Sequence, residues 1–459
     1  MLNPRNLEIL RSKRGTRWRC WDFAVGLIAF CLAFLFTPHK EHMPMAYYIF
    51  VVGCIYGAML QTSARLTGVP YPGQRTSRYE LITSVLLAVF LTYLAFSLLI
   101  GLVLLRAYGR YIVLTTTLAS AVGLMVPRWV LMQMFRLDPI KVVIYGAGNK
   151  GKNLLERLKN DPHFSVLGFL DNNPEFHGKR RHDYPVFGSI HNFGQAELTD
   201  IGADILVISI TADKLIAENA RAIMELPLAH IEVLNKGAFV EYYFKEISVE
   251  YGCPQWFASA PSVPGNPSLF AAKRLMDVAG SIAGLTLSLP LWPLIALAIK
   301  IDSRGPVFFH QNRIGWGGKV FRIIKFRTMV QEAEAEGAQW AVHHDPRITK
   351  VGRLLRVLRL DELPQLWNVL KGDMALVGPR PERPEFVEEL TREIPFYEQR
   401  HLVPPGLTGW AQVRYRYGSS KRDAIKKLQY ELYYVRHLSL MFDLEILMRT
   451  VPLVAKGSR

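Results

Sequence analysis

The sequence has few cysteines and comparatively few acidic residues, and each shortage excludes a class of protein. Only four of its 459 residues are cysteine, and Cys20, Cys31 and Cys54 lie in or beside apolar runs. This number and spacing give neither a disulfide framework nor a zinc site. Charged residues make up 20% of the chain and hydrophobic residues 50%, yet lysine and arginine outnumber aspartate and glutamate by 55 to 39. Because the apolar residues are clustered, this composition indicates a membrane protein with basic flanks and not a nucleic-acid-binding protein.

Long apolar runs are frequent in the N-terminal part of the chain. Four of them lie at residues 21–38, 45–61, 80–105 and 109–132. Each approaches the length that a helix needs to cross about 30 Å of hydrocarbon, so we predict a four-helix transmembrane region over residues 1–138. The basic stretch at 11–19 leads into the first run without a small-residue cleavage site, and no cleaved signal peptide is therefore expected.

The distribution of basic residues predicts the orientation of these helices. Residues 11–19, the loop at 65–78 and the segment at 136–141 are rich in arginine and lysine, which favours the cytoplasmic side for all three. Arg106 and Arg110 in the third loop oppose this orientation, but the other segments together carry more positive charge. We expect a multi-pass membrane protein whose soluble parts face the cytoplasm.

Residues 139–240 change to an alternation of short apolar strands and helices. The first strand, at 141–145, leads directly into a glycine turn, and Asp171 follows the second. This is typical of a Rossmann-like half, which predicts a nucleotide site at Gly146, Gly148, Gly151 and Asp171. The alternative is an accessory module whose glycines serve only the tight turn and helix packing, because this fold hosts many functions.

A further apolar run follows a linker. Residues 241–267 are rich in proline, serine and aromatic residues and are predicted to be that linker. The uncharged run at 278–299 is long enough to span a membrane, but prolines interrupt it, Pro290 first. A full crossing would place the following residues outside the cell while the α/β domain stayed inside, so we predict a re-entrant helix near 270–300. Ser288 is the candidate partner for backbone groups freed at the break.

The most informative stretch follows this broken run. Arg353, Arg356 and Arg359 recur every three residues with leucines between them, which predicts a helix with one basic edge and one apolar face. Pro364 has no N–H and would clash inside that helix. We therefore expect the first helix to end near residue 360 and a second to begin with Asp361 as its N-cap.

Two adjacent carboxylates, Asp361 and Glu362, would then lie beside arginines at a helix N-terminus. The helix N-terminus and the arginines both favour the ionised acid, which predicts that Asp361 is a nucleophile and a poor general acid. The same backbone N–H and guanidinium groups would attract a phosphate. The alternative is a capped surface helix with ion pairs. Arg380, which is fixed between Pro379 and Pro381, suits the holding of a phosphate or a base.

A strand pair precedes this stretch and adds two cations. Residues 307–311 and 320–329 are predicted strands joined by a glycine-rich turn, and Lys325 and Arg327 share one face of the second strand. Such a pair suits a diphosphate, although a solvated edge has the same pattern. A nucleophilic carboxylate, a second carboxylate and several cations at a membrane suit phosphoryl transfer from a soluble donor to a lipid phosphate.

Four segments resemble the signature of a known family. They are GPVFFHQNR at 305–313, KFRTM at 325–329, RLDELPQLWNVLKGDMALVGPRPERPEF at 359–386 and PGLTGWAQ at 405–412. They resemble, in the same order, the motifs of bacterial sugar transferases, the polyprenyl-phosphate hexose-1-phosphate transferases. The resemblance covers about residues 268–459, and the arrangement of the whole chain is similar to the long form found in exopolysaccharide assembly.

This resemblance implies an architecture and a reaction. The fold would be a membrane α-helical bundle, a Rossmann-like α/β domain and an α+β catalytic domain at 268–459, seated on the membrane by the re-entrant helix. Asp361 would attack the sugar-bearing phosphorus of a UDP-hexose, with glucose favoured over galactose, and expel UMP. Undecaprenyl phosphate would then attack the phosphosugar-aspartate, and Glu362 would hold Mg²⁺.

The resemblance also implies binding residues and a location. The residues that would contact the nucleotide or its phosphates are Lys325, Arg327, Arg359, Arg380, Pro379, Pro381 and Arg313. The location would be the bacterial cytoplasmic membrane, and the sequence leaves open whether the chain forms a homo-oligomer.

Two other function classes are compatible with the residues. A membrane glycosyltransferase would transfer the sugar without phosphate and release UDP. A non-enzymatic membrane scaffold would sense nucleotides through the glycine turn at Gly146, and replacement of Asp361 would then have no effect.

Overall fold

The structure is a computed structural model that describes most of the chain. The described residues are 13–35, 45–70, 78–99, 110–134, 138–193, 195–210, 223–224, 226, 231–249, 267–331, 345–415 and 420–455. They form two compact units, one made of residues 1–136 with 441–449 and the other of 137–440 with 450–459.

The first unit contains a helix at each of the four predicted apolar runs. They are α2 (Lys13–Leu35), α3 (Met45–Leu66), α4 (Arg78–Leu99) and α5 (Arg110–Met134). Helix α2 packs on α3 and α5, and α4 packs on α3 and α5, around buried residues such as Leu60, Val85 and Leu124. By length and composition, α4 and the Ile112–Met134 part of α5 are candidate membrane spans. The prediction of helices able to cross a membrane is thus confirmed for two of the four runs, and for α2 and α3 it stays a prediction.

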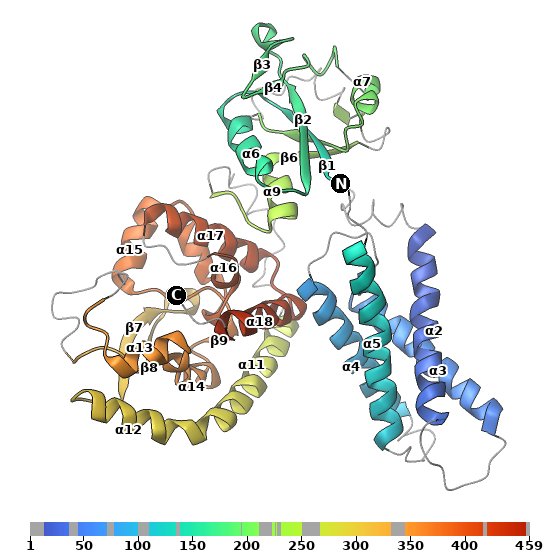
Figure 1. Ribbon diagram of the computed structural model, residues 1–459. Coiled ribbons are helices and arrows are strands. Elements are labelled where there is room, and N and C mark those ends of the chain that lie inside the picture. The colour runs from blue at the N-terminus through green and yellow to red at the C-terminus, as the bar shows by residue number, and fades with distance from the viewer. Residues whose placement is uncertain are drawn as a thin grey trace. The chain divides into compact units, whose positions relative to one another are not determined.

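The α/β domain is built on a parallel sheet with strand order β2-β1-β5-β6 (Figure 1). Its strands are β1 (Ile140–Tyr145), β2 (Phe164–Leu170), β5 (Ile205–Ile208) and β6 (Glu232–Asn235), and its helices include α6 (Asn149–Lys159), α7 (Gln195–Asp200) and α9 (Lys236–Phe244). A short hairpin of β3 (Arg180–Arg181) and β4 (Tyr184–Pro185) lies between β2 and α7. Apolar residues of β1 and β5 point to both faces of the sheet and form two buried clusters, as expected for a parallel sheet with both faces covered.

The predicted linker begins as an ordered connection. Helix α9 ends at Phe244, and Ile247 and Val249 enter a buried cluster with Leu390 and Leu428 of the catalytic domain. Between these anchors, the buried Glu246 carboxylate pairs with two cations, one from each domain. They are Arg157 of α6 and Lys426 of α17 (Lys421–Arg436). Residues 250–266 lie outside the described residues.

The catalytic domain starts with a broken helix, made of α11 (Pro267–Ser288), the 3₁₀ turn η7 (Leu289–Leu291) and α12 (Trp292–Asp302). The break lies at the predicted proline, and Figure 1 shows the two arms meeting in a bend. As predicted, Ser288 provides a partner for a backbone group at the break, because its Oγ donates to the Leu285 carbonyl at 3.3 Å. The same oxygen accepts from the Trp292 indole at 3.3 Å. By length and composition, Pro267–Asp302 is also a candidate span.

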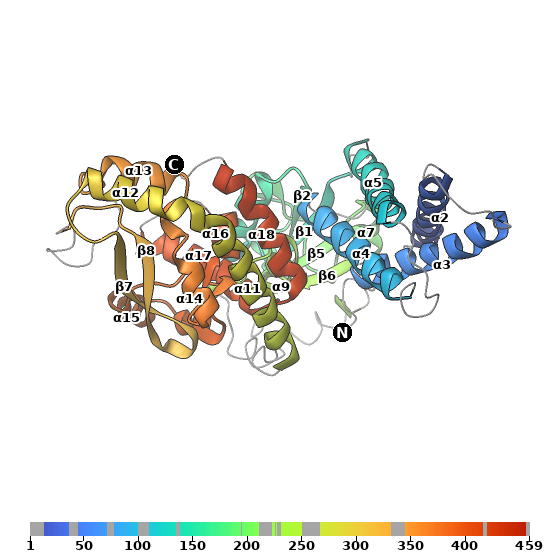
Figure 2. The same cartoon turned by 90° about the horizontal axis from the view of Figure 1, so that it is seen from below.

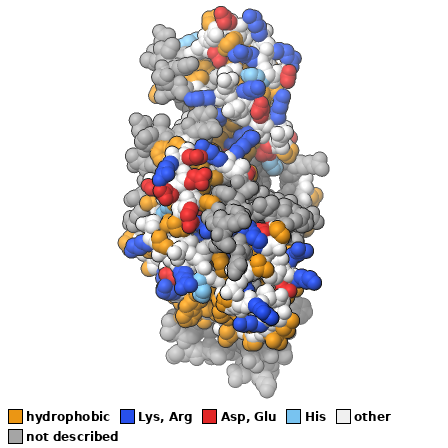
Figure 3. Space-filling model, turned by 90° about the vertical axis from the view of Figure 1, so that its left-hand side faces the viewer, with side chains coloured by type: hydrophobic (Ala, Val, Ile, Leu, Met, Phe, Trp, Pro, Cys, Tyr) orange, Lys and Arg blue, Asp and Glu red, His pale blue; other side chains and the backbone are white. Residues whose placement is uncertain are grey.

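One face of this broken helix is apolar and exposed, whereas the other is fixed to the domain by buried polar groups. Figure 3 shows hydrophobic side chains gathered at the lower edge of this face of the molecule. The large hydrophobic residues of α12 that are exposed are Leu294, Leu297 and Ile301. On the inner face, Lys273 Nζ donates to the Val377 carbonyl and Asp277 accepts from the Leu376 N–H, both at 2.9 Å.

The remaining elements assemble above this helix. The antiparallel pair β7 (Phe308–Ile314) and β8 (Val320–Phe326) is joined through η8 (Trp316–Gly318), and β9 (Ala375–Val377) pairs in parallel with β10 (Gly406–Thr408). The helical elements are α13 (Lys350–Val357), η9 (Leu360–Glu362), α14 (Gln365–Lys371), α15 (Pro384–Glu393), η10 (Tyr397–Leu402), α16 (Trp410–Arg414) and α17. Helix α18 (Leu440–Ala455) follows them in the chain, and its residues 441–449 belong to the first unit. Helix α14 packs on α11, and Figure 2 shows the two side by side.

Candidate active site

The two carboxylates lie in a 3₁₀ turn and not at a helix N-cap. Helix α13 ends at Val357, and Arg359 adopts the left-handed conformation with φ 54°, so the chain turns into η9. Pro364, and not Asp361, is the N-cap of α14. The predicted break is confirmed, but the predicted cap is wrong, because the left-handed residue inserts a separate turn between the two helices. This turn packs on α12, since Leu360 and Leu363 contact a cluster that includes Ile295 and Ile299 of that helix.

Asp361 is buried, with 9% of its surface exposed. Burial is the largest influence on it and raises the pKa of Asp361, and the adjacent Glu362 carboxylate raises it further; Lys325, Arg356 and Arg380 oppose them. The expectation that its surroundings favour the ionised form is therefore wrong in direction. A carboxylate with few stabilising contacts retains a strong tendency to form a new bond, which a nucleophile needs.

Glu362 has the opposite environment and is surrounded by cations. Its Oε1 lies 2.9 Å from Arg380 Nη2 and 3.4 Å from Lys325 Nζ, and its Oε2 lies 3.8 Å from Arg359 Nη1. Burial opposes the charge, but Arg380 and Lys325 outweigh it and lower the pKa of Glu362 to about 2. The two neighbouring acids thus differ in pKa, a pattern that is typical of sites in which each has its own role.

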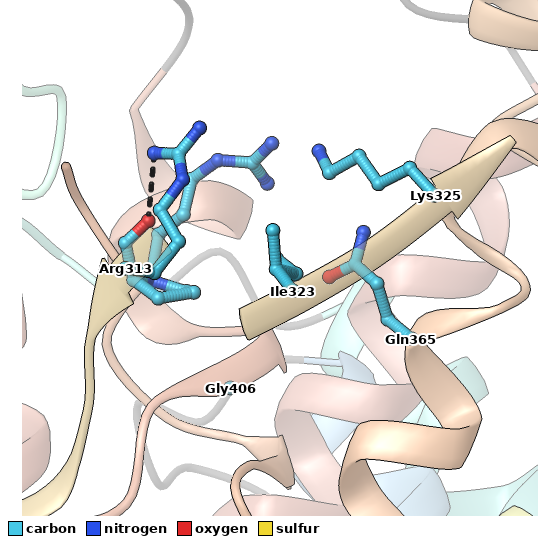
Figure 4. Close-up of a pocket in the computed structure, with 7 residues that line it drawn as sticks. Arg313, Ile323, Lys325, Gln365 and Gly406 are labelled. Carbon is cyan, nitrogen blue, oxygen red and sulfur yellow. Dashed lines mark hydrogen bonds between the residues drawn. The ribbon is translucent and has the colours of Figure 1, made fainter. Parts of the chain in front are cut away.

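A small pocket opens beside these acids, and hydrogen-bond donors line most of it. Its walls are Arg313, Ile323, Lys325, Gln365, Arg380, Pro381 and Gly406. Figure 4 shows the side chains of Arg313, Lys325 and Gln365 directed into the same space. An arrangement of guanidinium, ammonium and amide N–H groups around one space favours an oxyanion.

The segment that carries Arg380 is held at each of its carbonyl groups. Successive carbonyls of residues 379–382 accept from Gly406 N (2.8 Å), Arg400 Nη2 (2.7 Å), Arg313 Nη1 (3.1 Å) and Ile314 N (2.9 Å). The donors come from different parts of the domain, so the segment is fixed from several sides. Two prolines restrict the same backbone, and the Arg380 guanidinium is thereby presented in one position.

Arg400 and Glu431 form a buried pair behind this segment, and the sequence analysis did not identify either. Arg400 donates to both Glu431 carboxylate oxygens at 2.8 Å, and the exposed fractions of the two side chains are 2% and 6%. Burial opposes the charge of Arg400, but Glu431 outweighs it and raises the pKa of the guanidinium. Thirty residues separate the two in sequence, and no local motif links them, so only the fold reveals the pair.

Arg327 does not line the pocket with Lys325. Its Nη2 donates to the Ser303 carbonyl (2.8 Å) and hydroxyl (3.0 Å) at the C-terminal end of α12. Gly305, with φ 122°, makes room for it, since a Cβ there would lie 2.1 Å from Arg327 Nη1. Strand β8 ends at Phe326, and the alternation that would place Arg327 beside Lys325 ends with it.

Glu362 stays the predicted Mg²⁺ ligand, and Asp361 is the carboxylate next to it in the chain. Among the described residues, no group of three or more histidine, cysteine, aspartate or glutamate side chains is placed to hold a metal. Mg²⁺ is commonly held by one or two carboxylates together with substrate phosphates and water, and Asp361 and Glu362 provide such a pair. A diphosphate in the pocket would compete for the cations that now contact Glu362.

The glycine turn of the α/β domain has the expected geometry, but Asp171 is engaged with the turn itself. Gly146 has φ 113°, and a Cβ on Gly151 would lie 2.0 Å from the Gly146 carbonyl oxygen, so both positions require glycine. Gly148 is the N-cap of α6. One Asp171 oxygen accepts from Ala147 N at 2.7 Å and the other from Asn173 N at 2.9 Å. These bonds account for the aspartate without a ligand, as in the accessory-module alternative.

Comparison with known proteins identifies the family. The profile of the family described as bacterial sugar transferase matches residues 268–457, and one described as CoA-binding domain matches residues 65–199. A UDP-N-acetylgalactosamine-undecaprenyl-phosphate N-acetylgalactosaminephosphotransferase of Aeromonas hydrophila is 38% identical over 306 residues, which are 66% of this chain and 69% of that protein. The chain belongs to the bacterial sugar transferase family.

Other sugar transferase relatives match the C-terminal part. A UDP-glucose:undecaprenyl-phosphate glucose-1-phosphate transferase of Caulobacter vibrioides is 42% identical over 41% of this chain and 73% of its own length. An exopolysaccharide production protein of Rhizobium leguminosarum is 40% identical over 39% of this chain and 92% of its own length. This sugar transferase is therefore an enzyme, and its family-matching region contains the pocket and both acids.

Proposed function

We propose that this sugar transferase moves hexose-1-phosphate from a UDP-hexose to undecaprenyl phosphate and releases UMP. The supporting observation is the buried Asp361 beside a pocket lined by cationic and amide donors, in a turn that packs on helix α12. The relatives carry names of transferases that use undecaprenyl phosphate with UDP-glucose or UDP-N-acetylgalactosamine. UDP-glucose is our first choice of donor.

The reaction would proceed in two displacements. An Asp361 carboxylate oxygen bonds to the sugar-bearing phosphorus, the bond from that phosphorus to the bridging oxygen breaks, and UMP leaves with the electron pair. An oxygen of undecaprenyl phosphate then bonds to the same phosphorus, and the Asp361 carboxylate is released. Dividing the transfer in this way avoids direct contact between two mutually repelling anionic substrates.

The cations around the pocket would stabilise the charge that develops on the phosphates. Arg380 and Lys325 contact Glu362 in the structure and would turn to the diphosphate when the donor binds. Arg359 lies at the same carboxylate and would act with them, whereas Arg327 would serve the site by fixing β8 to the end of α12. Asp361 and Glu362 would hold Mg²⁺, which would supply further neutralisation of the diphosphate.

The broken helix would seat the site on the cytoplasmic face of a bacterial inner membrane. The bend at Pro290 allows α11 and α12 to enter and leave the same face, and the exposed leucines of α12 suit the hydrocarbon. A re-entrant path keeps the α/β and catalytic domains on one side, where UDP-sugars are available. The lipid acceptor would then reach Asp361 from the bilayer.

The test is to identify the nucleotide released. Purified protein in nanodiscs with Mg²⁺ is given UDP-glucose, UDP-galactose or UDP-N-acetylgalactosamine, with undecaprenyl phosphate, and the nucleotides are separated by chromatography. We expect UMP, and the sugar that gives it is the substrate. Release of UDP would instead indicate a glycosyltransferase, and release of neither nucleotide would contradict the proposal for these donors.

A further inference from the structure

Gln365 is a buried amide whose nitrogen has no partner. It is the first residue of α14, its exposed fraction is 3%, and its Nε2 has no hydrogen-bond acceptor among the described residues. The residue lines the pocket, and Figure 4 shows its amide group directed into the space that Lys325 also enters. A buried donor without an acceptor is uncommon and destabilises the empty protein.

The surroundings of Gln365 define what could satisfy it. The groups nearest the pocket space are those of Arg313, Arg380 and Lys325, and all three are donors without acceptor capacity. The acceptor must therefore come from outside these side chains, and a ligand that matches several cations and one neutral N–H is a phosphoryl oxyanion. A carbonyl or hydroxyl group would satisfy the amide but would not match the positive charge of the pocket wall.

A second buried amide on the same helix has a structural role and serves as a comparison for Gln365. Asn368, one turn further along α14, is 1% exposed, and its Oδ1 accepts from Ile324 N at 3.0 Å. Its Nδ2 donates to the Arg322 carbonyl at 2.9 Å and to Asp373 at 3.3 Å. Asn368 thus joins α14 to β8 with every polar group used, whereas Gln365 leaves its donor directed at the pocket.

We propose that Gln365 Nε2 is a binding group for the diphosphate of the nucleotide-sugar donor. This assignment rests on the proposed function and adds a residue to the site. The pocket walls include Arg380, which the proposed function places on the donor's diphosphate, and its neighbour Pro381. We therefore assign the donor's phosphates to the pocket. The phosphate of the lipid acceptor is the other ligand with the same chemistry. The unpaired amide destabilises the empty protein, and an acceptor oxygen of the bound donor would remove this destabilisation.

The experiment compares Gln365→Met and Gln365→Glu with Asn368→Leu in detergent-solubilised full-length protein. Apparent melting temperature is measured with and without UDP, and KM is measured separately for the UDP-sugar and for undecaprenyl phosphate. Gln365→Met should melt at the same or a higher temperature than wild type, because the unsatisfied N–H group has gone. Gln365→Glu should also do so, because its carboxylate would face the cations that line the pocket. Their KM for the UDP-sugar should rise about tenfold to a hundredfold, and the stabilisation by UDP should shrink.

Asn368→Leu should instead lower the melting temperature, because it breaks bonds that the empty protein already has. A fall in melting temperature for Gln365→Met with an unchanged KM for the UDP-sugar would overturn the assignment and give Gln365 a structural role. A rise in KM for undecaprenyl phosphate alone would overturn it in favour of the acceptor. Because wild type is assayed in parallel, failure of wild type to release UMP would count against the proposed function, and an unchanged Gln365 variant only against this inference.

Discussion

The buried pair of Arg400 and Glu431 should set the position of Arg380, and this can be separated from its effect on stability. Arg400→Met removes two bonds to Glu431 and one to the Arg380 carbonyl, and it leaves a carboxylate buried with 6% exposure. Breaking a buried pair from one side costs about 3–5 kcal/mol, so this single variant should be strongly destabilised. Glu431→Leu should be similar, because it leaves the Arg400 charge buried.

The double variant Arg400→Met/Glu431→Leu is the informative one. Replacing both partners by apolar side chains of similar size is often close to neutral for stability, so the apparent melting temperature should recover most of the loss. The Arg380 carbonyl still lacks its donor, and the guanidinium becomes less well positioned. We therefore expect KM for the UDP-sugar to stay raised by about tenfold or more, while KM for undecaprenyl phosphate changes little.

The assay is UMP release at varied UDP-sugar concentration, with thermal unfolding followed in the same detergent. The matched control is Glu388→Gln, which breaks an exposed ion pair with Arg392 on α15 and should change both measurements little. Recovery of both the melting temperature and KM in the double variant would refute the reasoning, because the pair would then be structural only.

Two further predictions concern the acidic pair. Glu362 has its pKa lowered from 4.5 to about 2, so its ion pairs stabilise the fold fully above pH 4.5 and progressively less as the pH falls toward 2. The melting temperature of wild type should therefore exceed that of Glu362→Gln at pH 6, and the gap should narrow toward pH 3; a constant gap would contradict this. Removal of Mg²⁺ with EDTA should abolish UMP release and added Mg²⁺ should restore it, whereas release that is insensitive to EDTA would count against the metal.

Local sequence patterns predicted most of the architecture because each rests on a short-range rule. Apolar runs, the glycine turn at Gly146 and the break at Pro290 depend on neighbours within one element, and the structure has the expected element at each.

The parts of the site that the sequence did not predict depend on tertiary contacts. The sequence shows the arginines near Asp361, and a low pKa was therefore expected. The burial of Asp361 outweighs the arginines, and it is a property of the fold that the sequence does not show. Arg327 was placed beside Lys325 by strand alternation, but the strand ends one residue earlier. Arg400 lies outside the four motifs, and Gln365 lies inside one of them without a role that its neighbours in sequence would indicate. The partners of Arg400, and the lack of one for the Gln365 amide, appear only when α14, α17 and the segment around Arg380 are assembled.

The most direct test of the account is a single-turnover experiment without the lipid acceptor. Wild-type protein and Asp361→Asn are mixed with Mg²⁺ and the UDP-sugar labelled at the sugar-bearing phosphate. UMP is then quantified, and the labelled peptide is mapped by mass spectrometry. The account predicts a rapid burst of up to about one UMP per wild-type enzyme, label on the peptide that contains Asp361, and neither result in the variant. UMP release that requires undecaprenyl phosphate from the first turnover, with no label on the protein, would contradict the phosphosugar-aspartate.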